Sequence, residues 1–202
     1  MLRPSSVYRR IPGFRRVKKA WRSRGFGIHS PFAFRFISRV LRERGEYYAY
    51  GELRRLAGSQ RRFRELSLLF RLVCHFRPAA VRVVGEPDEG VRGAVRLADS
   101  GAVLIEERDR ANGSNRSDGA DGTDGVWLMV IFEDAPLADG GLVDEALEVL
   151  ERGGGVVCRD VDAGMLAGLK SRLENGMTFT NGHLTVLVGR HDLPRQDFEL
   201  NF

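Results

Sequence analysis

The chain has 202 residues, of which 43% are hydrophobic, so it can bury a substantial core in one domain with an appendage. Its charge is uneven: residues 1–77 hold 20 Lys and Arg against 4 Asp and Glu, whereas residues 78–202 hold 12 against 23. This split suggests an anionic partner for residues 1–77, either a nucleic acid or an anionic membrane surface. The alternative is a basic helical layer that packs beside an acidic α/β domain of the same chain.

Composition argues against membrane-spanning and secreted proteins. The longest apolar run, residues 126–132, is too short to cross a bilayer, and the basic N-terminus lacks the apolar segment of a secretory signal. Cys74 and Cys158 both lie in apolar runs without a second cysteine at CxxC spacing. We therefore expect two reduced, buried thiols in an intracellular protein.

The first 24 residues carry nine Lys and Arg and no acidic residue. Phe14, Val17 and Trp21 fall at helical spacing, which predicts an amphipathic basic helix over 13–23. Such a helix can lie on an acidic partner or on anionic lipid, or be a solvated helix held by its few apolar side chains. An arginine-rich, acid-free opening is also typical of an organellar transit peptide, which is an alternative to a cytoplasmic location.

Two further helices are predicted before residue 78. Ser30 followed by Pro31 is typical of a helix start, with the hydroxyl as the cap and proline in the first turn. A second helical pattern covers 61–76, with arginines such as Arg71 expected on its outer face. Residues 46–50 form an aromatic cluster, which we interpret as a connector. Residues 1–77 are therefore predicted to form a basic helical extension.

From residue 78 strands alternate with helices, which predicts an α/β domain over 78–202. Helices are expected at 91–100, at 141–152 and after Asp162. The continuous apolar run at 126–132 is typical of a central parallel strand, and the last strands should form an antiparallel pair. The strands are predicted at 81–85, 102–106, 126–132, 156–158, 177–180, 184–189 and 198–202.

Residues 108–125 consist mainly of Asp, Asn, Gly, Ser and Thr, with almost nothing to bury. We predict a flexible polar loop there. Its aspartates at 118, 121 and 124 do not match the spacing of a calcium-binding loop, so no metal site is predicted.

Four stretches of the sequence resemble one known family. They are Gly27-Ile-His-Ser-Pro-Phe32, Tyr47-Tyr-Ala-Tyr50, Leu69-Phe-Arg-Leu-Val73 and Asp197-Phe-Glu-Leu-Asn-Phe202. Together with a parallel sheet closed by a terminal hairpin, they resemble bacterial class I S-adenosylmethionine-dependent methyltransferase-like proteins, in which a basic "GIHSPF" helical preface precedes the enzyme fold. The resemblance covers most of the chain. It implies a cytoplasmic protein with a Rossmann-like sheet, reduced here because the polar loop replaces the region of the third strand.

The resemblance also implies a cofactor site around the first strand. In the family that strand ends in an acid, one further residue and a glycine-rich turn. Here the acid position is Val83, and the turn 85–90 contains Pro87, which has no backbone N–H to donate. Glu106 stands where the family has its ribose-binding carboxylate. The residues implied to bind S-adenosylmethionine are Gly85, Glu86, Gly90, Glu106 and Glu133.

The strand at 156–158 is followed by the last position that the resemblance addresses. Asp160 resembles one member of a pair of aspartates in the family, while Arg159 replaces its partner and Asp162 replaces a histidine. Metal-assisted chemistry is therefore not predicted, and no catalytic residue is assigned.

Two functional hypotheses follow. The first is methyl transfer from S-adenosylmethionine, in which the enzyme mainly aligns the acceptor with an already activated methyl group. The acceptor stays open between a small molecule, a protein side chain and RNA. The second is a catalytically inactive scaffold, a pseudoenzyme, whose basic residues 1–77 bind nucleic acid or an anionic membrane surface. The altered turn at 85–90 weakens the first hypothesis, but methyl transfer is kept as the function of the family.

Overall fold

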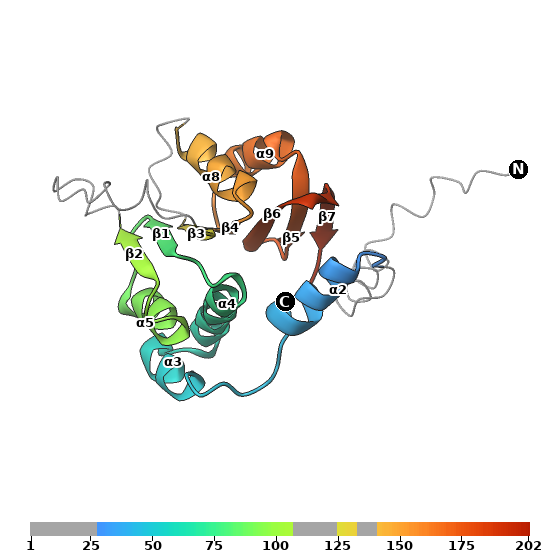
Figure 1. Cartoon of the computed structure of the whole chain (residues 1–202). Helices are drawn as coiled ribbons and strands as arrows, with labels where there is room; N and C mark the ends of the chain where they lie inside the picture. The colour runs from blue at the N-terminus through green and yellow to red at the C-terminus, as the bar shows by residue number, and fades with distance from the viewer. Residues whose placement is uncertain (1–27, 107–124, 133–140) are drawn as a thin grey trace, which may run out of the picture.

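The computed structural model describes residues 28–106, 125–132 and 141–202. These residues form a mixed seven-stranded sheet between two layers of helices (Figure 1), an α/β architecture compatible with a Rossmann-like fold. The predicted α/β class is therefore confirmed. The helix predicted at 13–23, nearly all of the predicted loop and Glu133 lie outside the described residues.

The strands follow the predicted order along the chain. They are β1 (Ala80–Val84), β2 (Val103–Glu106), β3 (Trp127–Ile131), β4 (Gly155–Arg159), β5 (Asn175–Thr180), β6 (Leu184–Pro194) and β7 (Gln196–Glu199). Their order in the sheet is β2-β1-β3-β4-β6-β5-β7. Strands β1 to β4 pair in parallel, β6 is antiparallel to both of its neighbours, and β7 pairs in parallel with β5. The strand order thus reverses between β1 and β3.

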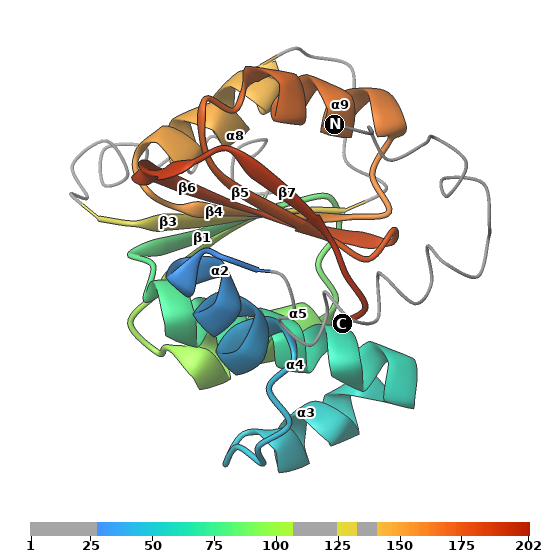
Figure 2. The ribbon, with the colours of Figure 1, turned by 90° about the vertical axis from the view of Figure 1, so that its right-hand side faces the viewer.

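The helices cover both faces of the sheet. They are α2 (Pro31–Phe36), η2 (Ile37–Leu41), α3 (Tyr50–Ala57), α4 (Gln60–Phe76), α5 (Glu89–Ala98), α8 (Gly141–Glu151) and α9 (Ala163–Arg172). Figure 2 shows α8 and α9 above the sheet and α2, α4 and α5 below it. Helix α3 packs against α4 and α5 and lies farther from the sheet than they do.

Local sequence signals account for several helix ends. The hydroxyl of Ser30 accepts a hydrogen bond from the Ala33 amide at 3.2 Å, so α2 begins where the Ser-Pro pair predicts. Helix α4 ends at Phe76 and is capped by Arg77, whose φ of 46° is left-handed, directly before a proline. The prediction for residues 46–50 is wrong in part, because α3 begins at Tyr50.

The helices of residues 28–77 share a hydrophobic core with the sheet. Phe36 of α2 packs on Phe179 of β5, with ring centroids 4.9 Å apart. Buried side chains from α2, η2, α3, α4 and α5 form one continuous cluster with one face of the sheet, and α8 and α9 form a second cluster on the other face. The charge boundary at residue 77 thus lies within a packed body, and the division into two domains stays a prediction.

Arg71 of α4 links these helices. The prediction that it lies on the outer face is wrong, because the residue is buried. Its guanidinium donates to the carbonyl of Val40 at 2.6 Å and to the hydroxyl of Tyr50 at 2.7 Å. Carbonyl oxygens at the end of a helix stabilise a cation, so Arg71 holds the end of η2 and the start of α3 against α4.

Candidate functional site

The strand order reverses between β1 and β3, and ligands of open α/β sheets bind outside the carboxyl ends of the strands at such a point. At this edge β1 is followed by the turn 85–90, β2 ends at Glu106, and β4 is followed by Asp160. We define the carboxyl edge as these segments together with the side chains of α4, α5 and β6 that contact them. It is the candidate functional site.

The turn after β1 retains one feature of a glycine turn. Gly85 has a φ of 103°, in the region that favours glycine over residues with a Cβ atom. Glu86 is exposed, and the carboxylate of Asp88 caps α5 by accepting from the Val91 amide at 2.9 Å. The predicted order of strand, turn and helix is therefore confirmed.

Gly90 lies inside α5 and permits a close contact between two helices. A Cβ atom at this position would lie 2.7 Å from a terminal methyl carbon of Leu66 on α4. The space that the missing side chain leaves is occupied by Leu66. In the described structure, Gly90 thus serves the packing of α4 on α5.

Glu106 stands at the end of β2 and is held by α5. Arg92 donates from Nε to Glu106 Oε1 at 2.7 Å and from Nη2 to Oε2 at 2.9 Å. The hydrogen bond to Glu106 raises the pKa of the Arg92 guanidinium above its usual value. This bidentate pair engages both carboxylate oxygens, so a ribose diol would have to compete with a charge-assisted interaction.

Val83, which the resemblance places at the position of an acid, belongs to the hydrophobic core between the sheet and α4 and α5. Its exposed fraction is 0%. Its neighbour Arg82 points to the opposite face, where it pairs with Glu145 of α8. The first strand therefore offers no carboxylate at this position for the amino group of a cofactor.

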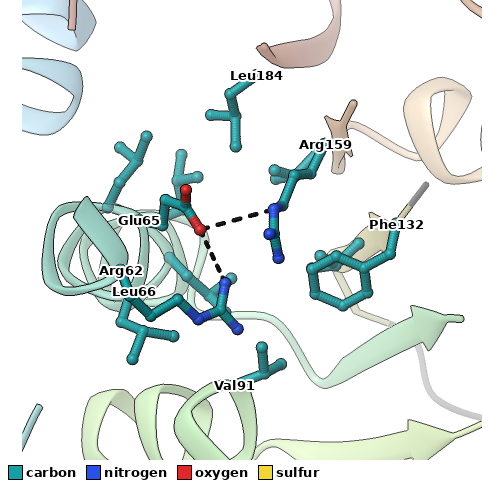
Figure 3. A pocket seen from close by; sticks show the side chains of 12 residues that line it. Arg62, Glu65, Leu66, Val91, Phe132, Arg159 and Leu184 are labelled. Atoms are coloured by element: carbon teal, nitrogen blue, oxygen red, sulfur yellow. Dashed lines mark hydrogen bonds and ion pairs between the residues drawn. The ribbon is translucent and has the colours of Figure 1, made fainter. Parts of the chain in front are cut away.

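A chain of charged side chains crosses the carboxyl edge between α4 and β4. Glu65 accepts from Arg62 at 2.8 Å and lies 3.6 Å from Nε of Arg159, and Figure 3 shows it between these two arginines. Arg62 also donates to Asp88 at 2.7 Å. The guanidinium of Arg159 lies over the ring of Phe132, 5.6 Å from its centroid. These contacts connect the turn after β1, the start of α4 and the end of β4.

The cavity behind this charged chain is small. Its volume is about 30 Å³, which accommodates one or two water molecules, whereas sites for drug-sized ligands have several hundred Å³. The walls are mainly apolar and include Leu66, Leu69, Leu72, Val91, Val130 and Val157. Among the described residues, the carboxylate of Glu106 is already paired and Val83 supplies no acid, so these two positions differ from what the resemblance implies for S-adenosylmethionine.

Two aspartates after β4 have structural partners. Asp160 Oδ1 lies 3.1 Å from Nδ1 of His183 at the start of β6, and the Asp160 amide donates to the carbonyl of the same histidine at 2.7 Å. Asp162 caps α9 by accepting from the Gly164 and Met165 amides. Within the described ranges, no three His, Cys, Asp or Glu side chains form a group suited to a metal ion.

Neither cysteine is activated as a nucleophile. Burial raises the pKa of the Cys158 thiol to about 12, and burial also raises the pKa of the Cys74 thiol. Both thiols are free; Cys158 is buried as predicted, whereas Cys74 is only half-buried. Among the described helices, none has the length and apolar character of a membrane span.

Sequence reasoning placed Gly85 and Glu106 at the carboxyl edge but missed the arginines that contact it. Arg62 and Glu65 are three residues apart on a helix, a spacing that favours an ion pair, so this contact was accessible from the sequence. The partners of Arg92 and Arg159 are distant along the chain, and no sequence signal indicates them. A search against models of known protein families and a search of curated proteins both find no match for this chain.

Proposed function

We propose that the chain is a class I methyltransferase-like protein whose carboxyl edge is structural, so that it acts as a scaffold and does not transfer methyl groups. The observation that carries this proposal is the bidentate pair of Arg92 and Glu106. The carboxylate that the family uses for the ribose stabilises the contact between α5 and β2 in this chain.

Two further contacts support a structural edge. The turn after β1 is tied to α4 through Arg62 and Asp88, and Leu66 covers Gly90. In a binding site for S-adenosylmethionine these positions would face the cofactor. Here they face other side chains of the protein, which fits a scaffold.

The scaffold's partner is proposed to be anionic and to bind the basic first part of the chain. On α3 and α4, Arg55 and Arg64 are exposed and have no carboxylate partner among the residues that the structure describes. Unpaired exposed arginines attract anions over several ångströms.

Calorimetric titration with S-adenosylmethionine and with its demethylated product tests the scaffold proposal. We expect no heat of binding at millimolar ligand for the folded full-length protein, with folding checked by circular dichroism. Micromolar binding of either ligand would contradict the proposal.

Methyl transfer is the second candidate function, and the position of the carboxyl edge in the sheet supports it. The strand order reverses beside β1, Gly85 follows this strand with φ 103°, and Glu106 ends β2. S-adenosylmethionine would supply an activated methyl group, and Gly85 and Glu106 are the residues at this edge that would hold it. If Arg92 alone blocks binding, the Arg92→Ala variant gains measurable affinity for the cofactor, whereas Arg96→Ala, on the same helix, does not. That result would favour the second candidate.

A further inference from the structure

The turn between α3 and α4 gathers positive charge. Residues 54–64 contain five arginines and no acidic residue. Gly58, with φ 64°, and the cap residue Ser59 join the two helices in a short turn. The arginine corner is defined as the side chains of Arg54, Arg55, Arg61 and Arg64, because the fifth arginine, Arg62, is directed at Glu65 and Asp88.

Packing holds this corner in place. The guanidinium of Arg54 lies over the ring of Phe63, 4.6 Å from its centroid, which joins the end of α3 to the start of α4. Phe63 itself is buried, and Ser59 caps α4 by accepting from the Arg62 amide at 3.2 Å. The four arginines therefore project from a fixed turn between two packed helices.

The corner carries more positive charge than its acidic neighbours neutralise. Arg54 pairs with Glu46 at 2.7 Å, and Arg61, which is 74% exposed, lies 3.5 Å from Glu65. Arg55 and Arg64 have no carboxylate partner within the described part of the chain. The positive end of the α4 dipole lies at the same corner and adds to the attraction for anions.

The chemistry of the corner favours a phosphate backbone over a lipid surface. Arginine presents a planar fork that matches the oxygens of a phosphate group. Exposed apolar side chains that enter the lipid strengthen binding to a membrane surface beyond the attraction of basic residues for anionic headgroups. Among the described residues, the large exposed apolar side chains are Phe34, Tyr48 and Val103, and none of them belongs to the corner.

We propose that the arginine corner binds the phosphate backbone of a nucleic acid without reading its base sequence. This inference rests on the proposed scaffold function and names the partner and the surface. Helix α3 lies on the side of α4 turned away from the sheet (Figure 2), and its exposed Arg55 is accessible to an extended polyanion.

The test is a salt titration of binding by fluorescence anisotropy, with the full-length protein and labelled duplex DNA and single-stranded RNA of unrelated sequences. The Arg55→Ala/Arg64→Ala double variant is compared with wild type and with Arg152→Ala/Arg195→Ala. The control pair removes the same charge from exposed arginines at the end of α8 and between β6 and β7, which also have no carboxylate partner in the described structure.

We expect the corner variant to bind all sequences more weakly and by the same factor. Its slope of log affinity against log salt should be about two units shallower than that of wild type, since each lost phosphate contact lowers the slope by about one. The control pair should keep the wild-type slope.

Three results would overturn the corner as the binding surface: equal losses in the two variants, no binding of nucleic acid by the wild-type protein at low salt, or binding to phosphatidylserine vesicles in place of nucleic acid. The outcome is separable from that of the scaffold proposal. Cofactor binding together with corner-dependent binding of nucleic acid would contradict the scaffold proposal and support the arginine corner as the nucleic-acid site. Unchanged nucleic-acid binding by the corner variant would contradict the arginine corner as the binding site and leave the scaffold proposal unaffected.

Discussion

The two ends of the sheet are stabilised by different interactions. At the antiparallel end, the ring of Phe198 on β7 stacks on Phe179 of β5 at 5.2 Å, and Phe179 contacts Phe36 of α2 at 4.9 Å. At the parallel end, ion pairs hold Glu106 and the turn after β1. One end is thus an apolar stack and the other a set of charged contacts.

The residues that carry the resemblance at 197–202 and the positions it implies for a cofactor lie at opposite ends of the sheet. The motif at 27–32 and the motif at 197–202 meet in the aromatic stack, because Phe32 also stacks on Phe36 at 5.7 Å. Phe32 of the first motif stacks on Phe36, and Phe198 of the second stacks on Phe179, so both motifs contact the pair of rings that joins α2 to the sheet. At the carboxyl edge, ion pairs join side chains of α4, α5 and β2 and the cap residue Asp88.

The largest effect is expected at the aromatic stack. The Phe36→Ala substitution removes a ring that is 1% exposed and should lower the free energy of unfolding by about 3–5 kcal/mol. Denaturant unfolding measures this loss. Phe34→Ala on the same helix is the control, since Phe34 is 48% exposed and should change stability by less than about 0.5 kcal/mol. Equal effects at the two positions would show that α2 does not pack as described.

A charged pair under α8 should give the next largest effect. The Glu145→Gln substitution removes the carboxylate that pairs with the buried Arg82. We expect the free energy of unfolding to fall by about 2–3 kcal/mol. This is less than for a fully buried pair, because the side chain of Glu145 is 28% exposed. Asp144 lies on the same helix and forms an exposed ion pair with Arg172 of α9. The Asp144→Asn substitution should therefore lower the free energy of unfolding by less than about 1 kcal/mol. A loss no larger for Glu145→Gln than for Asp144→Asn would contradict the buried pair.

Substitution of Gly90 distinguishes helix packing from a role in ligand approach. Gly90→Ala places a Cβ atom against Leu66 and should lower the free energy of unfolding by about 1 kcal/mol, because overpacking outweighs the gain in helix propensity. Gly168→Ala in α9 meets no atom within 4 Å and should stabilise the protein by about 0.5–1 kcal/mol. Thermal and denaturant unfolding of both variants provide the comparison. Stabilisation by Gly90→Ala would mean that α4 does not restrict this position.

The smallest effect concerns pH at the aromatic end. Burial, and secondarily the charge of Arg190, lowers the pKa of His75 from its usual 6.5. Below pH 6.5 the folded state therefore binds fewer protons than the unfolded state. As the pH falls from 6.5 through the folded-state pKa of His75, the free energy of unfolding decreases. Unfolding free energies measured across this range should fall more in wild type than in His75→Gln. Identical pH dependence in the two proteins would contradict a lowered pKa for His75.

Much of the fold was accessible from the sequence, because apolar periodicity and cap residues act locally. The strand predicted at 126–132 is β3, and the predicted start at Ser30-Pro31 is that of α2. Helix α3 was missed because it has only eight residues and is held by contacts of Tyr50 and Leu53 with the core. The burial of Arg71 depends on carbonyl groups about 30 residues earlier in the chain, which periodicity does not reveal.

Less of the candidate site was accessible. Gly85 and Glu106 follow strands, so the order of strand, turn and helix predicts their place at the edge of the sheet. Whether these positions are available to a ligand depends on partners that are distant along the chain. Arg92 lies 14 residues before Glu106, and Arg62 lies 26 residues before Asp88. Only the folded arrangement brings these pairs together.

Hydrogen–deuterium exchange with and without millimolar S-adenosylmethionine tests most directly whether the carboxyl edge is structural. The amides of the turn 85–90 and of the first turn of α5 would be covered by a bound cofactor. We predict the same exchange rates at these amides in both conditions, because Arg62 and Arg92 already occupy the carboxylates around them. Slower exchange confined to the turn and the end of β2 would contradict the account.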